Sequence, residues 1–341
     1  MMERPRFGRF LVFVAAGVTA VGLAACSSGS ASTASGSAAS GSGSGSGPEK
    51  TTITVDTLDS ADSAPLWLAI KDGFFAKQGL TVKVQFVKAT ALSFPDQAAH
   101  TVDFAVQNYV SMFGEMAKTP AAGLRIVAEN EVSAPNTNVV LVPKNSNIKT
   151  AAQLKGKVIG FASPGTSVAN LALDEQLKGY GLTAGDYTDD PIGFPAMQQA
   201  MASGSVAATF SIPPFITTME AGIGAHQLID LMTGPMASFP VVGWTTTAYE
   251  EQNYPRTVAA FQRAIEQGQQ AAAASQTTVR QILPQNITTL SSKIANIMAL
   301  QTYVTTTSET RLQRVATVMK QFNVPTVNDV APLIIPLPAG A

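Results

Sequence analysis

The chain has 341 residues and a formal net charge of −1, with 45% hydrophobic and only 13% charged residues. Its Lys and Arg residues are scattered rather than clustered, so we expect no nucleic-acid partner. Because Cys26 is the single cysteine, internal disulfides, thiolate metal sites and a cysteine nucleophile in the folded part are excluded. His100 and His226 have no acidic or cysteine partner at ligand spacing, so we expect no metal site and no cofactor.

The N-terminal segment has the order of a secretory signal peptide. Arginines 4, 6 and 9 precede an apolar run at residues 10–21, and small residues follow up to Cys26. A cysteine after Leu23, Ala24 and Ala25 looks like a bacterial lipobox, which implies cleavage after residue 25, lipid on Cys26 and a mature chain tethered outside the cytoplasmic membrane. The alternatives are a plain signal peptide or a single membrane anchor, although the apolar run is shorter than the about 20 residues of a typical span.

Residues 26–48 form the next segment, in which Ser27 to Gly47 are almost wholly Ser, Gly, Ala and Thr. Such a composition cannot bury enough surface to offset chain entropy, so we expect a flexible linker. At roughly 5–6 Å × √n its mean reach is on the order of 25 Å. A tether of this kind suits a protein that works beside a membrane partner.

Strands and helices alternate from Thr51 onward. Polar and apolar residues alternate at 51–56 and 80–87, and shorter apolar runs at 103–106 and 124–128 predict two further strands. Pro65 after a Ser/Asp loop marks a helix start, and two more helices are expected at residues 90–100 and 110–118. This alternation predicts a parallel sheet with helices on both faces.

The same alternation of strands and helices begins again at Lys157. Strands are expected at 157–161, 187–191 and 206–210, with helices at 167–180, 195–202 and 213–221. We interpret this part as a second α/β domain inside the first, with strands 138–143 and 241–248 at its two edges. Helices at 257–275, 291–301 and 309–320 would return to cover the first sheet. The predicted fold is α/β, with two doubly wound lobes joined by two crossovers: lobe 1 at 49–135 plus 242–341, and lobe 2 at 136–241.

Two lobes joined by two crossovers leave a cleft, and ligands of open α/β sheets sit outside the carboxyl ends of the strands. That rule selects candidate ligand-binding residues from loops of both lobes: Ser60, Asp62, Ser63, Thr90, Gln107, Asn108, Tyr109, Ser163, Thr166, Ser167, Phe194, Pro213 and Phe215. Trp244, on the returning crossover, could line the cleft or pack in the hinge. The serine and threonine hydroxyls could equally be helix caps.

The candidate loops also limit the chemistry of the ligand. Several of them open helices, whose free N–H groups could hold a sulfonate, nitrate or carboxylate. Lys88 is the nearest cationic side chain, so a doubly charged anion is not expected. Aromatic residues near the loops favour an organic solute with a flat or apolar body over bare nitrate, and Asp59 or Asp62 could pair with an amine.

Several segments match a known family in order: residues 65–69, 73–75, 79–82, 102–106, 148–160, 197–200 with Gly204, and 213–215. Through these segments the chain resembles the solute-binding proteins of ABC importers, in the nitrate, sulfonate, taurine and thiamine-precursor group. His100-Thr101 departs from the group, which usually has a glycine in this turn. The resemblance implies a type II periplasmic-binding-protein fold and a lipid-anchored, monomeric, extracytoplasmic receptor. It further implies delivery of a small solute to an ABC permease with its ATPase subunit.

A membrane-anchored enzyme on the same two-lobed fold is the alternative. Catalysis usually needs a general base or an activated nucleophile held by a partner. The folded region carries no nucleophile-elbow, Walker or His-Glu-x-x-His pattern. We therefore expect a receptor, not an enzyme. A surface lipoprotein whose cleft no longer binds a solute is a third possibility.

Overall fold

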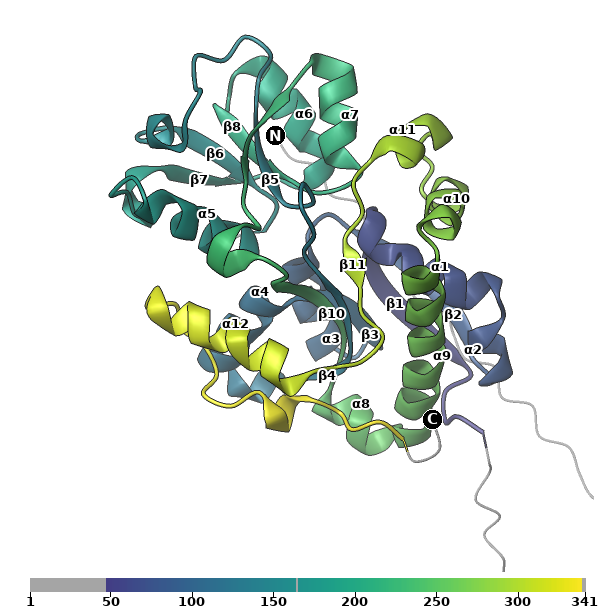
Figure 1. Ribbon diagram of the computed structural model, residues 1–341. Coiled ribbons are helices and arrows are strands. Elements are labelled where there is room, and N and C mark those ends of the chain that lie inside the picture. Colours follow the sequence, from purple (N-terminus) through teal and green to yellow (C-terminus); the bar gives the residue numbers. More distant parts are fainter. Residues whose placement is uncertain (1–46, 164, 339–341) are drawn as a thin grey trace, which may run out of the picture. The chain divides into compact units, whose positions relative to one another are not determined.

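The computed structural model describes residues 47–163 and 165–338 (Figure 1). The expected signal peptide, Cys26 and nearly all of the linker lie outside the described residues. Two separate β-sheets, each with its own helices, organise the described part. Among the described residues, no helix combines the length and the apolar character that crossing a bilayer requires.

The first sheet has six strands in the order β11–β4–β10–β3–β1–β2. β1 pairs in parallel with β2 and β3, whereas β10 runs antiparallel to both β3 and β4. Every residue of β3 is buried, while the side chains of β2 are exposed or half-buried because β2 lies at the sheet edge. The strands are β1 Thr52–Leu58, β2 Thr81–Val87, β3 Phe104–Asn108, β4 Leu124–Val132, β10 Pro240–Thr247 and β11 Thr302–Tyr303.

The second sheet has five strands in the order β7–β6–β8–β5–β9. β6 pairs in parallel with β7 and β8, and β5 runs antiparallel to β8 and β9. The chain enters this sheet between β4 and β5 and leaves it between β9 and β10, which gives the two crossovers. The strands are β5 Val139–Val142, β6 Val158–Phe161, β7 Thr188–Pro191, β8 Ala208–Ser211 and β9 His226–Asp230.

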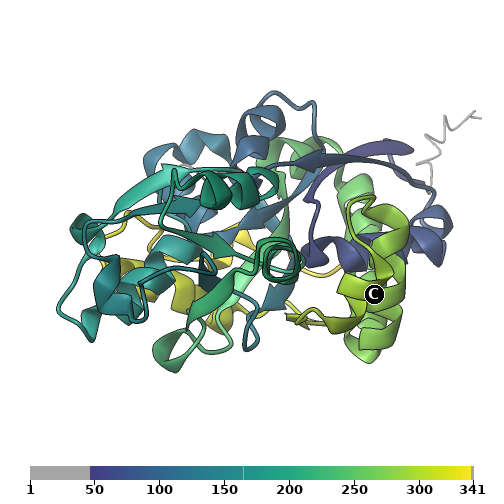
Figure 2. The ribbon, with the colours of Figure 1, turned by 90° about the horizontal axis from the view of Figure 1, so that it is seen from above.

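Helices connect the strands and cover the sheets. The longest, α9, packs against α1 and β4, and Figures 1 and 2 show α9 and α10 beside the N-terminal elements of the first lobe. The helices are α1 Ala64–Lys71, α2 Phe74–Lys77, α3 Phe94–Ala98, α4 Tyr109–Lys118, α5 Val168–Lys178, α6 Phe194–Ser203, α7 Phe215–Ile223, α8 Ala248–Asn253, α9 Pro255–Ala274, α10 Gln276–Asn286, α11 Ser292–Ile297 and α12 Glu309–Gln321. The 3₁₀ turns are η1 Ala61–Ser63, η2 Thr90–Ser93, η3 Pro120–Ala122, η4 Ala151–Leu154, η5 Ala184–Asp186, η6 Gly234–Met236 and η7 Ala331–Leu333.

Several sequence-based expectations need correction. Both sheets are mixed rather than parallel, because β4 carries the chain out of the first lobe and β10 brings it back alongside in the opposite direction. The strand expected at 241–248 therefore lies inside the first sheet, and β5 lies inside the second sheet rather than at its edge. The expected helix at 90–100 is divided into η2 and α3. The sequence patterns did not predict strand β9 or helix α10 as separate elements.

Candidate functional site

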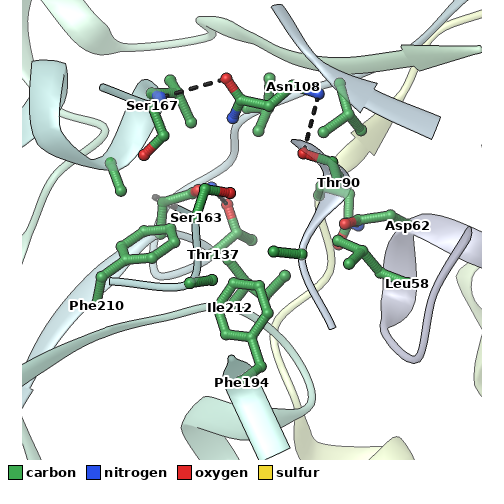
Figure 3. Close-up of a pocket in the computed structure, with 18 of the residues that line it drawn as sticks. Leu58, Asp62, Thr90, Asn108, Thr137, Ser163, Ser167, Phe194, Phe210 and Ile212 are labelled. Atoms are coloured by element: carbon green, nitrogen blue, oxygen red, sulfur yellow. Dashed lines mark hydrogen bonds between the residues drawn. The ribbon is translucent and has the colours of Figure 1, made fainter. Parts of the chain in front are cut away.

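A pocket lies between the strand ends of the two sheets (Figure 3). It encloses about 540 Å³ of free space when the open solvent at its entrance is included. The carboxyl ends of β1, β3, β6 and β8 all reach it, which is the position expected for a ligand in an α/β protein. It is lined by Leu58, Asp62, Ala89, Thr90, Asn108, Glu131, Thr137, Asn138, Ala162, Ser163, Ser167, Val168, Ala169, Phe194, Phe210, Ile212, Pro213, Val241, Val242 and Gln301.

The structure brings half of the sequence-selected residues together around this pocket. Figure 3 shows Asp62 and Thr90 on one side of it, with Phe194 and Phe210 on another. Both lobes contribute, as a site that closes on a solute requires. The selected residues that line the pocket are Asp62, Thr90, Asn108, Ser163, Ser167, Phe194 and Pro213. Their contact with a solute stays a prediction.

Asn108 connects the two lobes. Its Oδ1 accepts hydrogen bonds from the backbone N–H groups of Val110 and Ser111, at 3.0 and 3.3 Å, and so caps α4. The same oxygen accepts from the N–H of Val168, at 3.3 Å, in the first turn of α5. One side-chain oxygen therefore holds the start of a helix in each lobe.

We expect Asn108→Ala to lower the free energy of unfolding by about 1–2 kcal/mol, because the α4 cap and the bond to α5 are both lost. Urea denaturation measures this, and small-angle scattering should show a larger radius of gyration as the lobes separate. Asn108→Asp is the matched control, since a carboxylate can accept the same three N–H bonds. Equal stability and radius for Asn108→Ala and the unmodified protein would contradict this role.

Three other selected residues use their polar groups inside the first lobe. The Ser63 hydroxyl donates to the carbonyl of Ser60 at 2.8 Å and accepts from Trp67 Nε1 at 3.1 Å. Ser60 itself is fully buried. Gln107 Nε2 donates to Gln97 Oε1 at 3.1 Å, and both side chains are buried. None of the three selected residues lines the pocket.

The two large aromatic candidates of the first lobe are core residues. Trp244 is fully buried, its Nε1 donates to Asn130 Oδ1 at 3.0 Å, and its ring packs edge-on against Phe261. Trp244 does not line the pocket. Tyr109 is also fully buried and packs against Phe113.

The remaining two candidates lie next to the pocket. Phe215 stacks on Phe194, with ring centroids 5.2 Å apart and planes 8° from parallel, so it supports a ring that does line the pocket. Thr166 lines a separate cavity beside α4, and its carbonyl accepts a hydrogen bond from the Ser111 hydroxyl at 3.3 Å. That bond is a second direct link between the lobes.

One end of the pocket is acidic. Asp62 and Glu131 are nearly fully buried there, and Gln301 Nε2 donates to Asp62 Oδ1 at 2.6 Å. Burial raises the pKa of the Asp62 carboxyl, and burial together with the Asp62 charge raises the pKa of Glu131 well above its ordinary value. No Lys, Arg or His is among the lining residues of the described chain.

Sequence reasoning missed Glu131, Gln301 and Asn138. The strand expected at 124–128 in fact runs to Val132, so the polar run Glu129–Glu131 extends to the pocket, and that polar run was the available signal. Gln301 was assigned to a helix, but α11 ends at Ile297 and Gln301 precedes β11. No local pattern links it to Asp62, 239 residues away in the chain.

Two α/β lobes joined by two crossovers, with a pocket between their strand ends, define the periplasmic solute-binding class of fold. The chain belongs to the NMT1/THI5-like family, whose family model matches residues 60–278.

Solved structures share this fold. The alkanesulfonate-binding protein SsuA from Xanthomonas axonopodis pv. citri, solved with MOPS bound, has a TM-score of 0.70 at 17% identity and covers 84% of this chain and 99% of its own. The ligand-binding component of an ABC-type import system from Staphylococcus aureus, with zinc bound, has a TM-score of 0.71 at 14% identity, covering 84% and 97%. At such identities the likeness shows the fold alone.

Two curated relatives match part of the chain. A Haemophilus influenzae protein named for thiamine biosynthesis is 33% identical over 138 residues, 40% of this chain. The 4-amino-5-hydroxymethyl-2-methylpyrimidine phosphate synthase of Aspergillus parasiticus is 32% identical over 130 residues, 37% of this chain. The matches span 42% and 35% of these relatives' own lengths.

Proposed function

We propose that this protein is the extracytoplasmic solute receptor of an ABC importer. It captures a small organic solute, either sulfonate- or taurine-like or thiamine-precursor-like, and delivers it to the permease. The observation that carries this proposal is the pocket lined from both lobes, where Asn108 of one lobe accepts a hydrogen bond from Val168 of the other. The name of the Staphylococcus aureus protein, a component of an ABC-type import system, also supports it.

The mechanism is a shift between open and closed arrangements of the lobes. A solute touches both lobes only when they are closed, so its binding free energy stabilises the closed form. The backbone N–H of Ala61 in the first lobe donates to the carbonyl of Pro213 in the second at 3.2 Å, beside the pocket. Such bonds add to closure, and the closed receptor docks on the permease while the separate ATPase subunit drives release.

We further propose that lipid on Cys26 holds the receptor as a monomer at the outer face of the membrane, after cleavage of residues 1–25. The segment 26–48 then acts as the tether. In this proposal lobe 1 comprises residues 49–135 and 242–341, and lobe 2 comprises 136–241. Radiolabelled palmitate incorporation that disappears in Cys26→Ala tests the anchor; unchanged labelling would overturn it.

The receptor function is tested by native mass spectrometry of the purified protein, followed by scattering with and without the recovered solute. We expect a bound small molecule, recovered chemically unchanged after prolonged incubation, and a smaller radius of gyration when it is present. An unchanged radius with saturating solute would contradict the proposal.

A membrane-anchored enzyme is the second candidate, because one relative is named a pyrimidine phosphate synthase. Most of the similar solved structures are instead of binding proteins. Conversion of the recovered solute during incubation, lost after mutation of the pocket residues, would favour the enzyme over the receptor.

A further inference from the structure

The pocket contains polar atoms that are buried and have no partner, and all of them are hydrogen-bond acceptors. They are Glu131 Oε2, Gln301 Oε1 and Asn138 Oδ1. All three residues are at least nine-tenths buried. A buried polar atom without a partner costs roughly 1–3 kcal/mol, so a native site of this kind is expected to find its partner in the ligand.

The orientation of the two amides is determined by their own hydrogen bonds. Gln301 Nε2 donates to Asp62, which turns its Oε1 away from that bond. Asn138 Nδ2 donates to the hydroxyl of Thr137 at 3.2 Å, which leaves its Oδ1 free. The free atoms are therefore two amide carbonyl oxygens, which can only accept, and one Glu131 carboxyl oxygen, which accepts when the carboxyl is ionised.

We propose, resting on the receptor function above, that the pocket selects solutes that donate hydrogen bonds from nitrogen, such as an amidinium, a primary ammonium or an amino-substituted heterocycle, and rejects sulfonates, nitrate and carboxylates. An anion brings only acceptors and would leave the two amide oxygens, Gln301 Oε1 and Asn138 Oδ1, unpaired. It would also meet the Asp62 and Glu131 carboxyls with no cationic side chain among the described lining residues to offset them. The apolar walls, Phe194 and Phe210 among them, fit a flat ring attached to the donor group.

The starts of helices α4 and α5 do not offer free N–H groups to an anion. At the start of α5, the N–H groups of Ser167 and Val168 already donate to Asn170 Oδ1 and Asn108 Oδ1, at 3.0 and 3.3 Å. The first N–H groups of α4 are also taken by Asn108. The N–H groups that the sequence offered for an anion at the starts of α4 and α5 are thus used within the protein.

The acidic pair should make binding depend on pH. Burial raises the pKa of both Asp62 and Glu131, so their charges develop only as the pH rises above the ordinary carboxyl range. The other titratable groups that interact with the pair are Tyr303 on β11, whose hydroxyl donates to the Ala61 carbonyl, and Tyr109 on α4, which is fully buried near Glu131. Arg280 on α10 acts on Tyr303, and its guanidinium donates to the carbonyls of Ala295 and Met298. Affinity for a cation is therefore expected to increase from pH 5 to pH 8, as long as the cation keeps its proton.

The test uses matched probes that share a ring and differ in the polar group. Benzamidine and 4-aminopyrimidine present N–H donors, whereas benzenesulfonate and benzoate present only acceptors, and nitrate completes the panel. Calorimetry and thermal shift of the full folded chain should detect binding of the donor probes, rising with pH for benzamidine. Binding of benzenesulfonate, benzoate or nitrate in preference to the donors would overturn the inference and leave the receptor function standing. No binding by any probe, with no solute co-purifying, would contradict both.

Two variants separate recognition from folding. Asp62→Asn and Glu131→Gln should each weaken donor-probe binding by about 10- to 100-fold, since a charge-assisted bond is lost. Because the raised pKa values make these buried carboxylates unfavourable to the folded state at pH 7.5, both variants should melt at a higher temperature.

Glu266→Gln on α9 is the control: burial raises the pKa of Glu266 to about 7, but this residue does not line the pocket. It should raise the melting temperature and leave binding unchanged. Unaltered donor binding in both pocket variants would overturn the inference.

Discussion

Gly268→Ala is expected to lower the free energy of unfolding by about 3 kcal/mol, because helices α1 and α9 cannot remain at their present separation. A Cβ at Gly268 would overlap the carbonyl oxygen of Pro65 and lie 2.9 Å from the Cβ of Ala69. The atoms in the way are largely backbone, which cannot turn aside as a flexible side chain would. Urea denaturation followed by circular dichroism measures the loss.

The matched control is Gly114→Ala in α4. A Cβ there would have its nearest neighbour, the carbonyl oxygen of Pro325, at an ordinary 3.7 Å. With no steric cost, the better helix propensity of alanine should stabilise the protein by about 0.5–1 kcal/mol. The two substitutions are chemically identical, so equal effects on stability would refute the packing argument.

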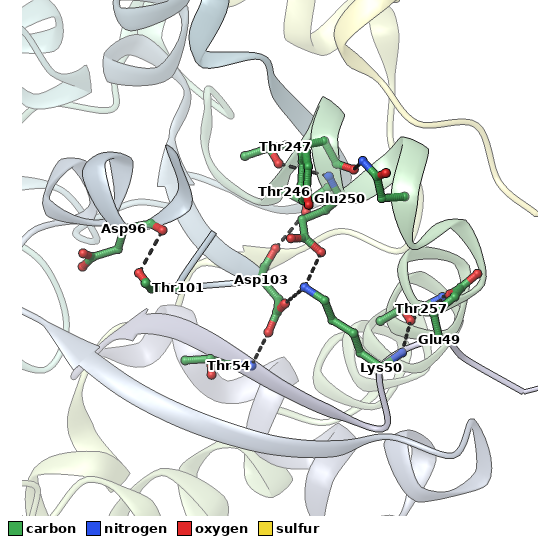
Figure 4. A network of polar contacts seen from close by, with 12 residues as sticks. Glu49, Lys50, Thr54, Asp96, Thr101, Asp103, Thr246, Thr247, Glu250 and Thr257 are labelled. Carbon is green, nitrogen blue, oxygen red and sulfur yellow. Dashed lines mark hydrogen bonds and ion pairs between the residues drawn. The ribbon is translucent and has the colours of Figure 1, made fainter. Parts of the chain in front are cut away.

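The second large effect is expected at Lys50, near the start of the described residues (Figure 4). Its Nζ lies 2.6 Å from Asp103 Oδ1 and 2.7 Å from Glu250 Oε2, and 4.0 Å from the centre of the Tyr254 ring. Asp103 also accepts from the N–H of Thr54 at 2.7 Å. This network links Lys50 to β1, to α8 and to Asp103, the residue before β3.

We expect Lys50→Met to cost about 2–3 kcal/mol of unfolding free energy, less than the roughly 3–5 kcal/mol of a fully buried pair because the Lys50 side chain is 23% exposed. The loss arises because the Glu250 carboxylate, 2% exposed, keeps no cationic partner. Lys155→Met is the control: this side chain is 67% exposed and 3.3 Å from Asp186, so its loss should cost less than about 0.5 kcal/mol. A similar small cost for both variants, measured by chemical denaturation, would show that the Lys50 network adds no stability.

Local sequence patterns predicted most of the regular elements. Pro65 lies in the first turn of α1, and the alternation at 80–87 became β2 almost unchanged. Helix α12 begins where expected, with the Ser308 hydroxyl accepting from the N–H of Arg311. These features depend on neighbours within about four residues, which is the range that side-chain periodicity and capping describe.

The candidate site was partly accessible to the same reasoning. The rule that ligands gather at the carboxyl ends of strands selected Asp62, Thr90 and Asn108, all of which line the pocket. It also selected Gln107, whose side chain turns into the first lobe instead. Alternation along a strand decides which neighbour faces the pocket, and a shift of one residue exchanges the two faces.

The sequence by itself determined the alternation of strands and helices, the absence of internal disulfides and the set of loops in which the pocket would be found. Tertiary structure decided that β10 inserts between β3 and β4, and that Gln301 meets Asp62 across 239 residues. It also decided that Glu131 and Asn138 turn unpaired oxygens to the pocket. The physical reason is that periodicity describes one element at a time, whereas strand order and the pairing of buried polar atoms depend on which distant segments pack together.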